Sequence, residues 1–209
     1  MRLPKVNQVI LLIIVSQFIL TTGAGFLTPI FAVFVTQQIA GGTVAVVGFA
    51  LTIYWVTKSI LQLFVARHID KNHGEIDDFY FFVAGAYLNA VFLALYYFAT
   101  TSFHIYLIHF FIGISDSLLV PPFYAIFTRH IDKEHEGFEW SLYSSFSLGA
   151  GSALGAGVGG ILALLFGYRA VFPITGTLIF MAATILLLLK PFIKPKVPPP
   201  VSRLIVEKR

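Results

Sequence analysis

Six long apolar stretches dominate this sequence and leave few ways for the chain to fold. They cover residues 9–36, 43–66, 79–99, 103–128, 140–165 and 168–190, each to within a few positions. Each can cross the hydrocarbon core of a bilayer, which takes about 20 residues of α-helix. Only 11% of the 209 residues are charged, whereas soluble domains carry about 25%. We therefore predict an all-α integral membrane protein, a bundle of six transmembrane helices within the lipid bilayer.

The first stretch is too long for a straight helix perpendicular to the membrane. Gly23, Gly25 and Pro29 provide places where it can bend or break. Arg2 and Lys5 precede it, as basic residues precede a secretory signal, but a signal's apolar core has roughly 7–15 residues. We therefore expect this stretch to be retained as the first span. A β-barrel is excluded, because the short alternating segments of barrel strands do not occur.

Lysine and arginine are unequally divided between the two sides that six spans define. Twelve of the 14 basic residues fall on one side, Arg169 alone falls on the other, and Lys58 lies inside a span. Because basic residues accumulate on the cytoplasmic side, both termini are expected in the cytoplasm, with the protein in the plasma (cytoplasmic) membrane. The net charge of +4 thus reflects orientation, and no nucleic-acid partner is expected. Residues 1–190 form the six-span domain, and residues 191–209 a Pro-rich, basic cytoplasmic tail.

Two full charges, Lys58 and Asp116, lie inside spans, where each costs about 2.5–3.5 kcal/mol at the bilayer centre. Lys58 is 12 residues before Asp70, and Asp116 is 13 before Arg129. At 1.5 Å per residue these separations are about 18 and 20 Å along the helix. Both charges are therefore predicted near the midplane at similar height.

Polar residues form stripes on three of the predicted helices, which suggests a shared water-filled cavity. We expect Asp116 to be a proton-linked or cation-linked site, Lys58 its counter-charge or an anion contact, and His109 a proton relay. The alternatives are a structural Lys58–Asp116 ion pair, or a Lys58 that snorkels or faces a partner chain. Asn89, Ser144 and Ser145 either face the cavity or form interhelical hydrogen bonds. The three stripes are Gln17, Thr21 and Gly25; Tyr54, Lys58 and Gln62; and His109, Gly113 and Asp116.

A short sequence occurs twice at predicted cytoplasmic helix ends: Arg67-His68-Ile69-Asp70-Lys71 and Arg129-His130-Ile131-Asp132-Lys133. A histidine follows two residues later in each copy, at His73 and His135. One interpretation is a charge cluster that anchors the helix end among the lipid headgroups. The other is a cytoplasmic gate, formed by Arg67, Asp70, Lys71, Arg129 and Asp132. The neighbouring acids and bases suit ion pairing, so no metal site is predicted.

A glycine-rich predicted helix begins at Gly151 and is followed by Phe166-Gly167-Tyr168-Arg169 and Val171-Phe172. This stretch resembles the fifth helix of the major facilitator superfamily and its turn into the sixth. The resemblance covers about residues 9–190, as the N-terminal six-helix half of such a transporter. Glycines let neighbouring helices approach closely. The resemblance therefore implies a helix-packing role for Gly151, Gly155, Gly157, Gly159 and Gly160.

Other family positions differ. In the second connection the family has Gly, Asp, a base and Gly, where this chain has Ala66, Asp70, Lys71 and a Gly74 one residue late. In the fourth helix of the proton-coupled exporters an Arg precedes a Gly by four residues. Here His109 precedes Gly113, and Ala156 stands where the fifth-helix exporter pattern has Pro.

The resembled family normally has twelve spans in two six-span halves, arranged as parallel repeats. Two copies of this chain with the same orientation fit both positions, so we expect a homodimeric secondary transporter of a small-molecule substrate, coupled to an ion gradient. The alternatives are a half-transporter or truncated domain that needs a different partner chain, and a non-transporting scaffold or sensor. No nucleotide-binding loop, nucleophile–base pair or cysteine occurs, so neither an enzyme nor a cofactor is expected.

Overall fold

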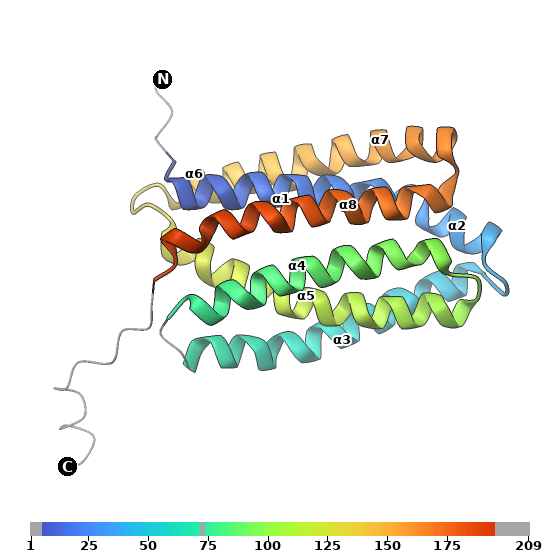
Figure 1. Ribbon diagram of the computed structural model, residues 1–209, viewed down its shortest axis with the longest axis horizontal. Coiled ribbons are helices and arrows are strands. Elements are labelled where there is room, and N and C mark those ends of the chain that lie inside the picture. Colours follow the sequence, from blue (N-terminus) through green and yellow to red (C-terminus); the bar gives the residue numbers. More distant parts are fainter. Residues whose placement is uncertain (1–5, 72–73, 195–209) are drawn as a thin grey trace, which may run out of the picture.

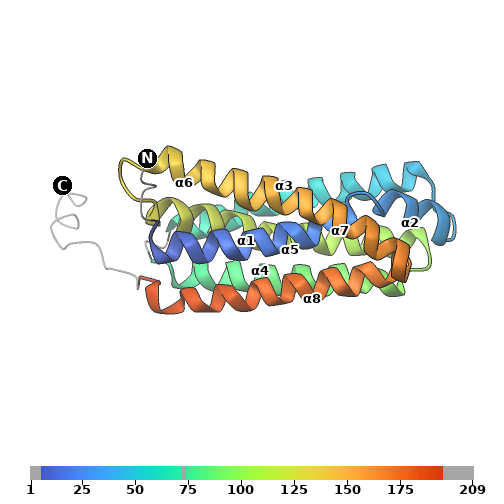
Figure 2. The ribbon, with the colours of Figure 1, turned by 90° about the horizontal axis from the view of Figure 1, so that it is seen from above.

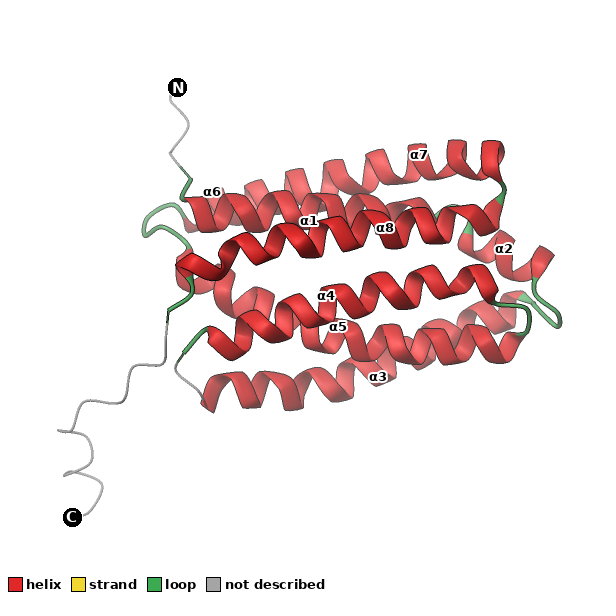
Figure 3. Cartoon of the chain, viewed as in Figure 1, coloured by secondary structure: helices red, strands yellow, loops and turns green. Residues whose placement is uncertain are grey.

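The computed structural model describes residues 6–71 and 74–194, and its helices form a bundle of six spans (Figure 1). Apart from an isolated bridge between Ala40 and Thr101, these residues contain no β-structure, as Figure 3 shows. All six spans are long and apolar enough to cross a membrane. The predicted fold class is therefore confirmed. The spans are α1 (Gln8–Leu27) with α2 (Phe31–Gln38); α3 (Val44–Lys71); α4 (Ile76–Leu95) with the 3₁₀ turn η1 (Tyr96–Phe98); α5 (Ser102–His130); α6 (Glu136–Leu142), η2 (Tyr143–Ala150) and α7 (Gly151–Phe166); and α8 (Tyr168–Leu186) with the 3₁₀ turn η3 (Leu187–Phe192).

Some boundaries differ from those expected. The first span breaks at Pro29, between α1 and α2, whereas Gly23 and Gly25 remain helical. Helix α3 runs to Lys71, five residues past the predicted end at residue 66, because Ile69 is buried against the bundle. The sixth span continues to Phe192, two residues into the predicted tail. The rest of that tail from residue 195, and the predicted roles of Arg2, Lys5 and His73, lie outside the described residues.

The six spans lie in two rows of three. In one row α3 packs on α5 and α5 on α4; in the other α7 packs on α1 and α1 on α8. The rows meet where α4 packs on α8, and Figure 2 shows these two helices along one side of the bundle, opposite α3 and α7. At the ends of the rows away from the α4–α8 contact, α3 and the fifth span are the least covered by other helices. The apolar windows of α3 and of the fifth span are 11% and 17% buried, against 44–50% for the other four spans.

Helices α1 and α7 touch through their backbones. A Cβ atom at Gly155 would lie 2.8 Å from the Gly25 Cα, and one at Gly159 would lie 2.5 Å from the Phe26 Cα. Both distances are too short for real atoms, so only glycine fits. Gly151 also faces α1, where its Cβ would lie 3.1 Å from the Phe18 carbonyl oxygen.

Two of the five glycines expected to pack helices do not do so within this chain. A Cβ at Gly157 or Gly160 would meet no atom within 4 Å in the described structure. Gly151, Gly155 and Gly159 are four residues apart and share one face of α7, whereas Gly157 and Gly160 are displaced from that face.

The middle of the fifth span extends this contact surface as a π-helix, η2. Ser147 lies four residues before Gly151, and its hydroxyl donates a hydrogen bond to the carbonyl oxygen of Ile14 at 2.9 Å. The Phe146 ring stacks on Phe18 of α1, with ring centroids 4.5 Å apart. Ser147 and the three glycines thus keep one continuous side of the fifth span against α1.

Arg169 joins three segments at the end of the bundle where α2 and η1 finish and α8 begins. Its guanidinium donates to the carbonyl oxygens of Tyr97 and Ala99, both at 2.8 Å, and to that of Gln38 at 3.3 Å. The same group lies 5.5 Å from the centre of the Phe34 ring. Arg169 therefore satisfies carbonyl oxygens at helix ends, where the intrahelical hydrogen bonds stop.

A pair of substitutions in α7 tests whether the backbone contact holds the bundle together. We expect Gly159→Ala to lower the free energy of unfolding by about 1–3 kcal/mol, because the added methyl group overpacks the contact with Phe26. Gly160→Ala is the matched control, with the same chemical change one residue later in open space. Thermal unfolding in lipid nanodiscs measures both. An equal loss of stability in the two variants would contradict the close contact.

Candidate functional site

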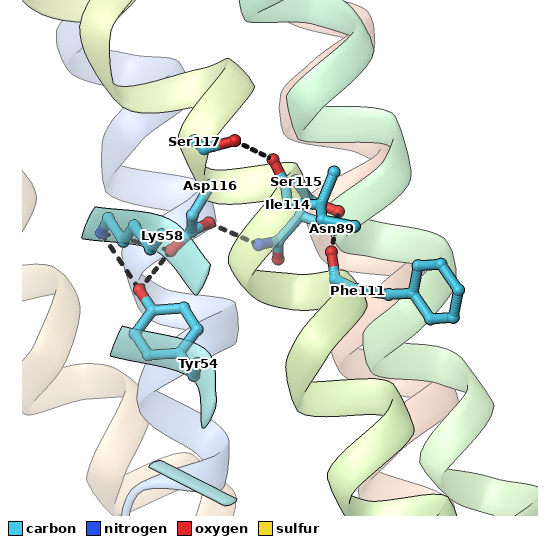
Figure 4. Close-up of polar contacts among 8 residues, drawn as sticks. All are labelled: Tyr54, Lys58, Asn89, Phe111, Ile114, Ser115, Asp116 and Ser117. Carbon is cyan, nitrogen blue, oxygen red and sulfur yellow. Dashed lines mark hydrogen bonds and ion pairs between the residues drawn. The ribbon is translucent and has the colours of Figure 1, made fainter. Parts of the chain in front are cut away.

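Four polar side chains from three helices meet near the middle of the bundle. Asp116 of α5 accepts hydrogen bonds from the Tyr54 hydroxyl and, at 2.7 Å, from the Asn89 side-chain amide of α4 (Figure 4). The Lys58 ammonium lies 3.4 Å from the Asp116 Oδ2 atom, which also accepts from Tyr54, and it donates to the Tyr54 hydroxyl at 3.0 Å. The two charges predicted at similar depth therefore lie side by side. We call Asp116, Lys58, Tyr54 and Asn89 the Asp116 cluster.

The surroundings explain how a carboxylate is tolerated at this depth. The side chains of Lys58 and Asp116 are only 14% and 18% exposed. An unpaired charge so placed is costly, whereas an opposite charge with hydrogen bonds offsets much of the desolvation. The Lys58 ammonium also lies over the rings of Tyr54 and Trp55, 5.4 and 5.1 Å from their centres.

A cavity of about 510 Å³ adjoins this cluster, between the first span and helices α3, α4 and α5. Tyr54, Asn89 and Asp116 line it, whereas Lys58 and all residues of the fifth and sixth spans do not. Most of the wall is apolar, with residues such as Leu20, Leu27 and Ile112. The rim residues Ala24, Ala32, Thr28 and Leu51 are exposed, so the cavity opens at the surface between the first span and α3.

His109 lines the same cavity but does not touch Asp116. Its Nδ1 atom is hydrogen bonded to the Tyr96 hydroxyl and lies 3.1 Å from the carbonyl oxygen of Ile105. The Phe31 ring packs against the imidazole, with ring centroids 5.0 Å apart. His109 and Asp116 are seven residues apart, about 10 Å along the helix. A proton passing between them would therefore need an intermediate carrier.

Several residues expected in the cavity lie elsewhere. Gln17 is buried within α1, and Thr21 is next to Gly151 of α7. Gln62 lines a separate pocket between α3 and α5, nearer the end where both helices finish. Ser144 and Ser145 are exposed on η2. The α1 side of this cavity is formed by the apolar residues Leu20, Ala24 and Leu27, which are neighbours of the polar stripe.

The two copies of the repeated pentapeptide have different environments. Arg129 forms an ion pair with Asp78, which is fully buried at the start of α4. The other carboxylate oxygen of Asp78 has no hydrogen-bond partner among the described residues. In the first copy, Arg67, Asp70 and Lys71 are exposed, and no ion pair links them to Arg129 or Asp132 within the described chain.

Further contacts connect the second copy to three other segments. Asn7 donates to the carbonyl oxygen of His130 at 2.6 Å and to the Asp132 carboxylate at 3.2 Å. His130 lies 3.6 Å from Glu75, whose carboxylate accepts from the backbone N–H of Lys194 at 3.0 Å. This end of the bundle is thus joined by polar contacts within one chain.

The partners of Arg129, His130 and His109 are not evident from the amino-acid sequence. Glu75 stands where the family pattern has a base, and Asp78 is one of several acids beside the start of a span, so neither position predicts a buried ion-pair partner. They are buried because a helix N-terminus stabilises negative charge and because Arg129 and His130 lie opposite them. Tyr96 was missed because an aromatic residue in an apolar run gives no sign that its hydroxyl meets His109.

Six helices long and apolar enough to span a membrane, with a charged cluster beside a mid-bundle cavity, define a multi-pass membrane protein with an internal polar site. Comparison with known families agrees. Residues 13–208 match the family model of the Major Facilitator Superfamily, and the chain belongs to this family. It is 25% identical over 185 residues to an uncharacterised MFS-type transporter of Methanocaldococcus jannaschii. That alignment covers 87% of this chain and 45% of the relative, so the chain spans about half of the relative's length.

The same substitution in the two copies of the pentapeptide tests whether the Arg129–Asp78 ion pair stabilises the fold. We expect Arg129→Met to lower the free energy of unfolding by about 3 kcal/mol, because it leaves the buried Asp78 carboxylate without its counter-charge. Arg67→Met, the same change in the exposed first copy, should cost less than about 0.5 kcal/mol. Chemical denaturation in lipid nanodiscs measures both variants. Similar losses in the two would show that Arg129 is no more structural than Arg67.

Proposed function

We propose that this chain is one six-helix unit of a secondary transporter, which moves a small solute through the cavity beside Asp116. The observation that carries the proposal is the adjacency of an open cavity of about 510 Å³ and the Asp116 cluster. Ionisable residues at membrane depth are expensive to maintain and typically mark a substrate or proton pathway. The family supports transport as the general activity.

The proposal places a second copy of the chain over the side of the bundle formed by α3 and the fifth span. These two spans are the least buried, and the cavity opens beside α3. A relative about twice as long has room for a second six-span unit. Two copies related by a two-fold axis would supply the same arrangement from a single chain. The relative's length equally supports an alternative, in which a different chain is the partner.

The proposed coupling ion is a proton, carried by Asp116. Three donors among the described residues surround this carboxylate, and the Lys58 ammonium contacts it both directly, at 3.4 Å, and through the Tyr54 hydroxyl. Protonation would remove the attraction that holds Lys58 and Tyr54 beside Asp116. These residues belong to α3 and α5, so protonation would change how tightly the two helices are joined beside the cavity.

The assembly can be tested by measuring the mass of the protein extracted directly into native lipid particles. We expect two chains, twice 23.1 kDa. The chain has no cysteine, so cross-linking of single-cysteine variants can locate the interface between two copies. Ser59→Cys on α3 should cross-link between copies with a short bifunctional maleimide, whereas Met181→Cys, exposed on α8, should not. A single chain, or a mass that includes a different protein, would reject the homodimer.

Proton binding at Asp116 can be measured without knowledge of the solute. We expect acidification of the protein in nanodiscs to produce an infrared carboxyl band that Asp116→Asn removes and Glu136→Gln, an exposed control, retains. In proteoliposomes, pH-driven uptake of any solute that the wild type carries should be lost in Asp116→Asn. If that variant still transports in response to a pH gradient, Asp116 is not the coupling residue.

A further inference from the structure

The charges around the cavity are placed asymmetrically. Asp116 is the only aspartate, glutamate, lysine or arginine among the described residues that line it. Its counter-charge, Lys58, contacts the carboxylate from the α3 side, where its ammonium lies over the Tyr54 and Trp55 rings (Figure 4). A molecule in the cavity therefore meets the carboxylate and not the ammonium.

The carboxylate retains capacity for another positive partner. An ionised carboxylate has about four acceptor sites, and the described residues provide three donors, from Tyr54, Lys58 and Asn89. The Lys58 nitrogen is 3.4 Å from the Asp116 oxygen, whereas a strong charge-assisted hydrogen bond spans about 2.7–2.9 Å. Tyr54 and Lys58 both donate to the Oδ2 atom of Asp116, so the Oδ1 atom, which among the described residues accepts only from Asn89, keeps an acceptor site for a further partner.

The remaining wall favours an apolar molecule with little hydrogen-bonding capacity. Leu27, Leu93 and Ile112 are typical of it, and its few polar groups include Tyr96 and His109, which are bonded to each other. A sugar or an amino acid would lose most of its hydrogen bonds to water in such a site. Tyr54, Tyr96 and Phe31 also line the cavity, and aromatic rings attract organic cations.

We propose that this cavity binds a lipophilic organic cation of drug-like size, with its positive charge beside Asp116. The volume of about 510 Å³ is within the roughly 300–1,000 Å³ of pockets for such ligands. The inference rests on the proposed function only for the statement that the bound cation is carried across the membrane. An organic anion of equal size and apolarity would face the Asp116 charge and bind poorly.

Tetraphenylphosphonium and tetraphenylborate test the sign of the preferred charge, because the two ions have nearly the same size and shape. Binding of each is measured on the full chain in lipid nanodiscs, with the signal of empty nanodiscs subtracted, since both ions partition into lipid. We expect saturable tetraphenylphosphonium binding at least tenfold tighter than that of tetraphenylborate. Equal binding of the two ions, or tighter binding of the anion, overturns the proposal.

Variants then locate the binding. Asp116→Asn should weaken tetraphenylphosphonium binding at least tenfold, whereas Asp116→Glu keeps a carboxylate and should retain most of it. The exposed Glu136→Gln is the control for loss of one negative charge elsewhere. If Asp116→Asn fails to fold, Leu27→Trp should block the cavity and abolish binding; unchanged binding in either variant overturns the site. Binding without transport in proteoliposomes would reject the proposed function and leave the cation site intact.

Discussion

Helices within a bilayer gain little hydrophobic energy by contacting one another, since lipid tails are as apolar as their side chains. This bundle therefore depends on backbone contact at glycines. Gly155 and Gly159 allow α1 to pack closely against α7. In the same way, Gly85 allows α5 to pack against α4, and Gly176 allows α4 to pack against α8. At Gly113 a Cβ would lie 2.9 Å from the Tyr54 carbonyl oxygen, which brings α3 against α5 at the level of the Asp116 cluster. Close packing thus sets the distance at which the polar groups of that cluster meet.

Three groups of polar contacts lie at different levels of the bundle, and each joins a different set of helices. Arg169 holds the ends of α2, η1 and α8, and the Asp116 cluster joins α3, α4 and α5. At the opposite end, Arg129 and Asn7 connect α5 with the starts of α4 and α1. Since only the middle level adjoins the cavity, a change of charge there alters contacts next to a bound solute, whereas the two ends remain held within the chain.

The sequence predicted the spans well because length and apolarity are strong signals in a bilayer. It also placed Lys58 and Asp116 at one height, since the helical rise converts residue numbers into depth. It could not say which side of α1 faces the cavity. Polar residues such as Gln17 and Thr21 were expected there, yet the wall is formed by Leu20 and Ala24. In a membrane protein, polarity does not distinguish a cavity face from a packed interface, because both interhelical hydrogen bonds and water attract polar side chains.

The repeated pentapeptide shows why identical sequences can have different consequences. Arg129 meets Asp78 because α5 has neighbours on both sides, α3 and α4, so the end of that helix is enclosed. Arg67 lies near the end of α3, which packs on α5 along one side only, and its side chain is exposed. An arginine near the end of an enclosed helix forms its ion pair with a residue of the same chain. The same residue on an outer helix remains available to whatever covers α3, which in the proposed assembly is the second copy of the chain.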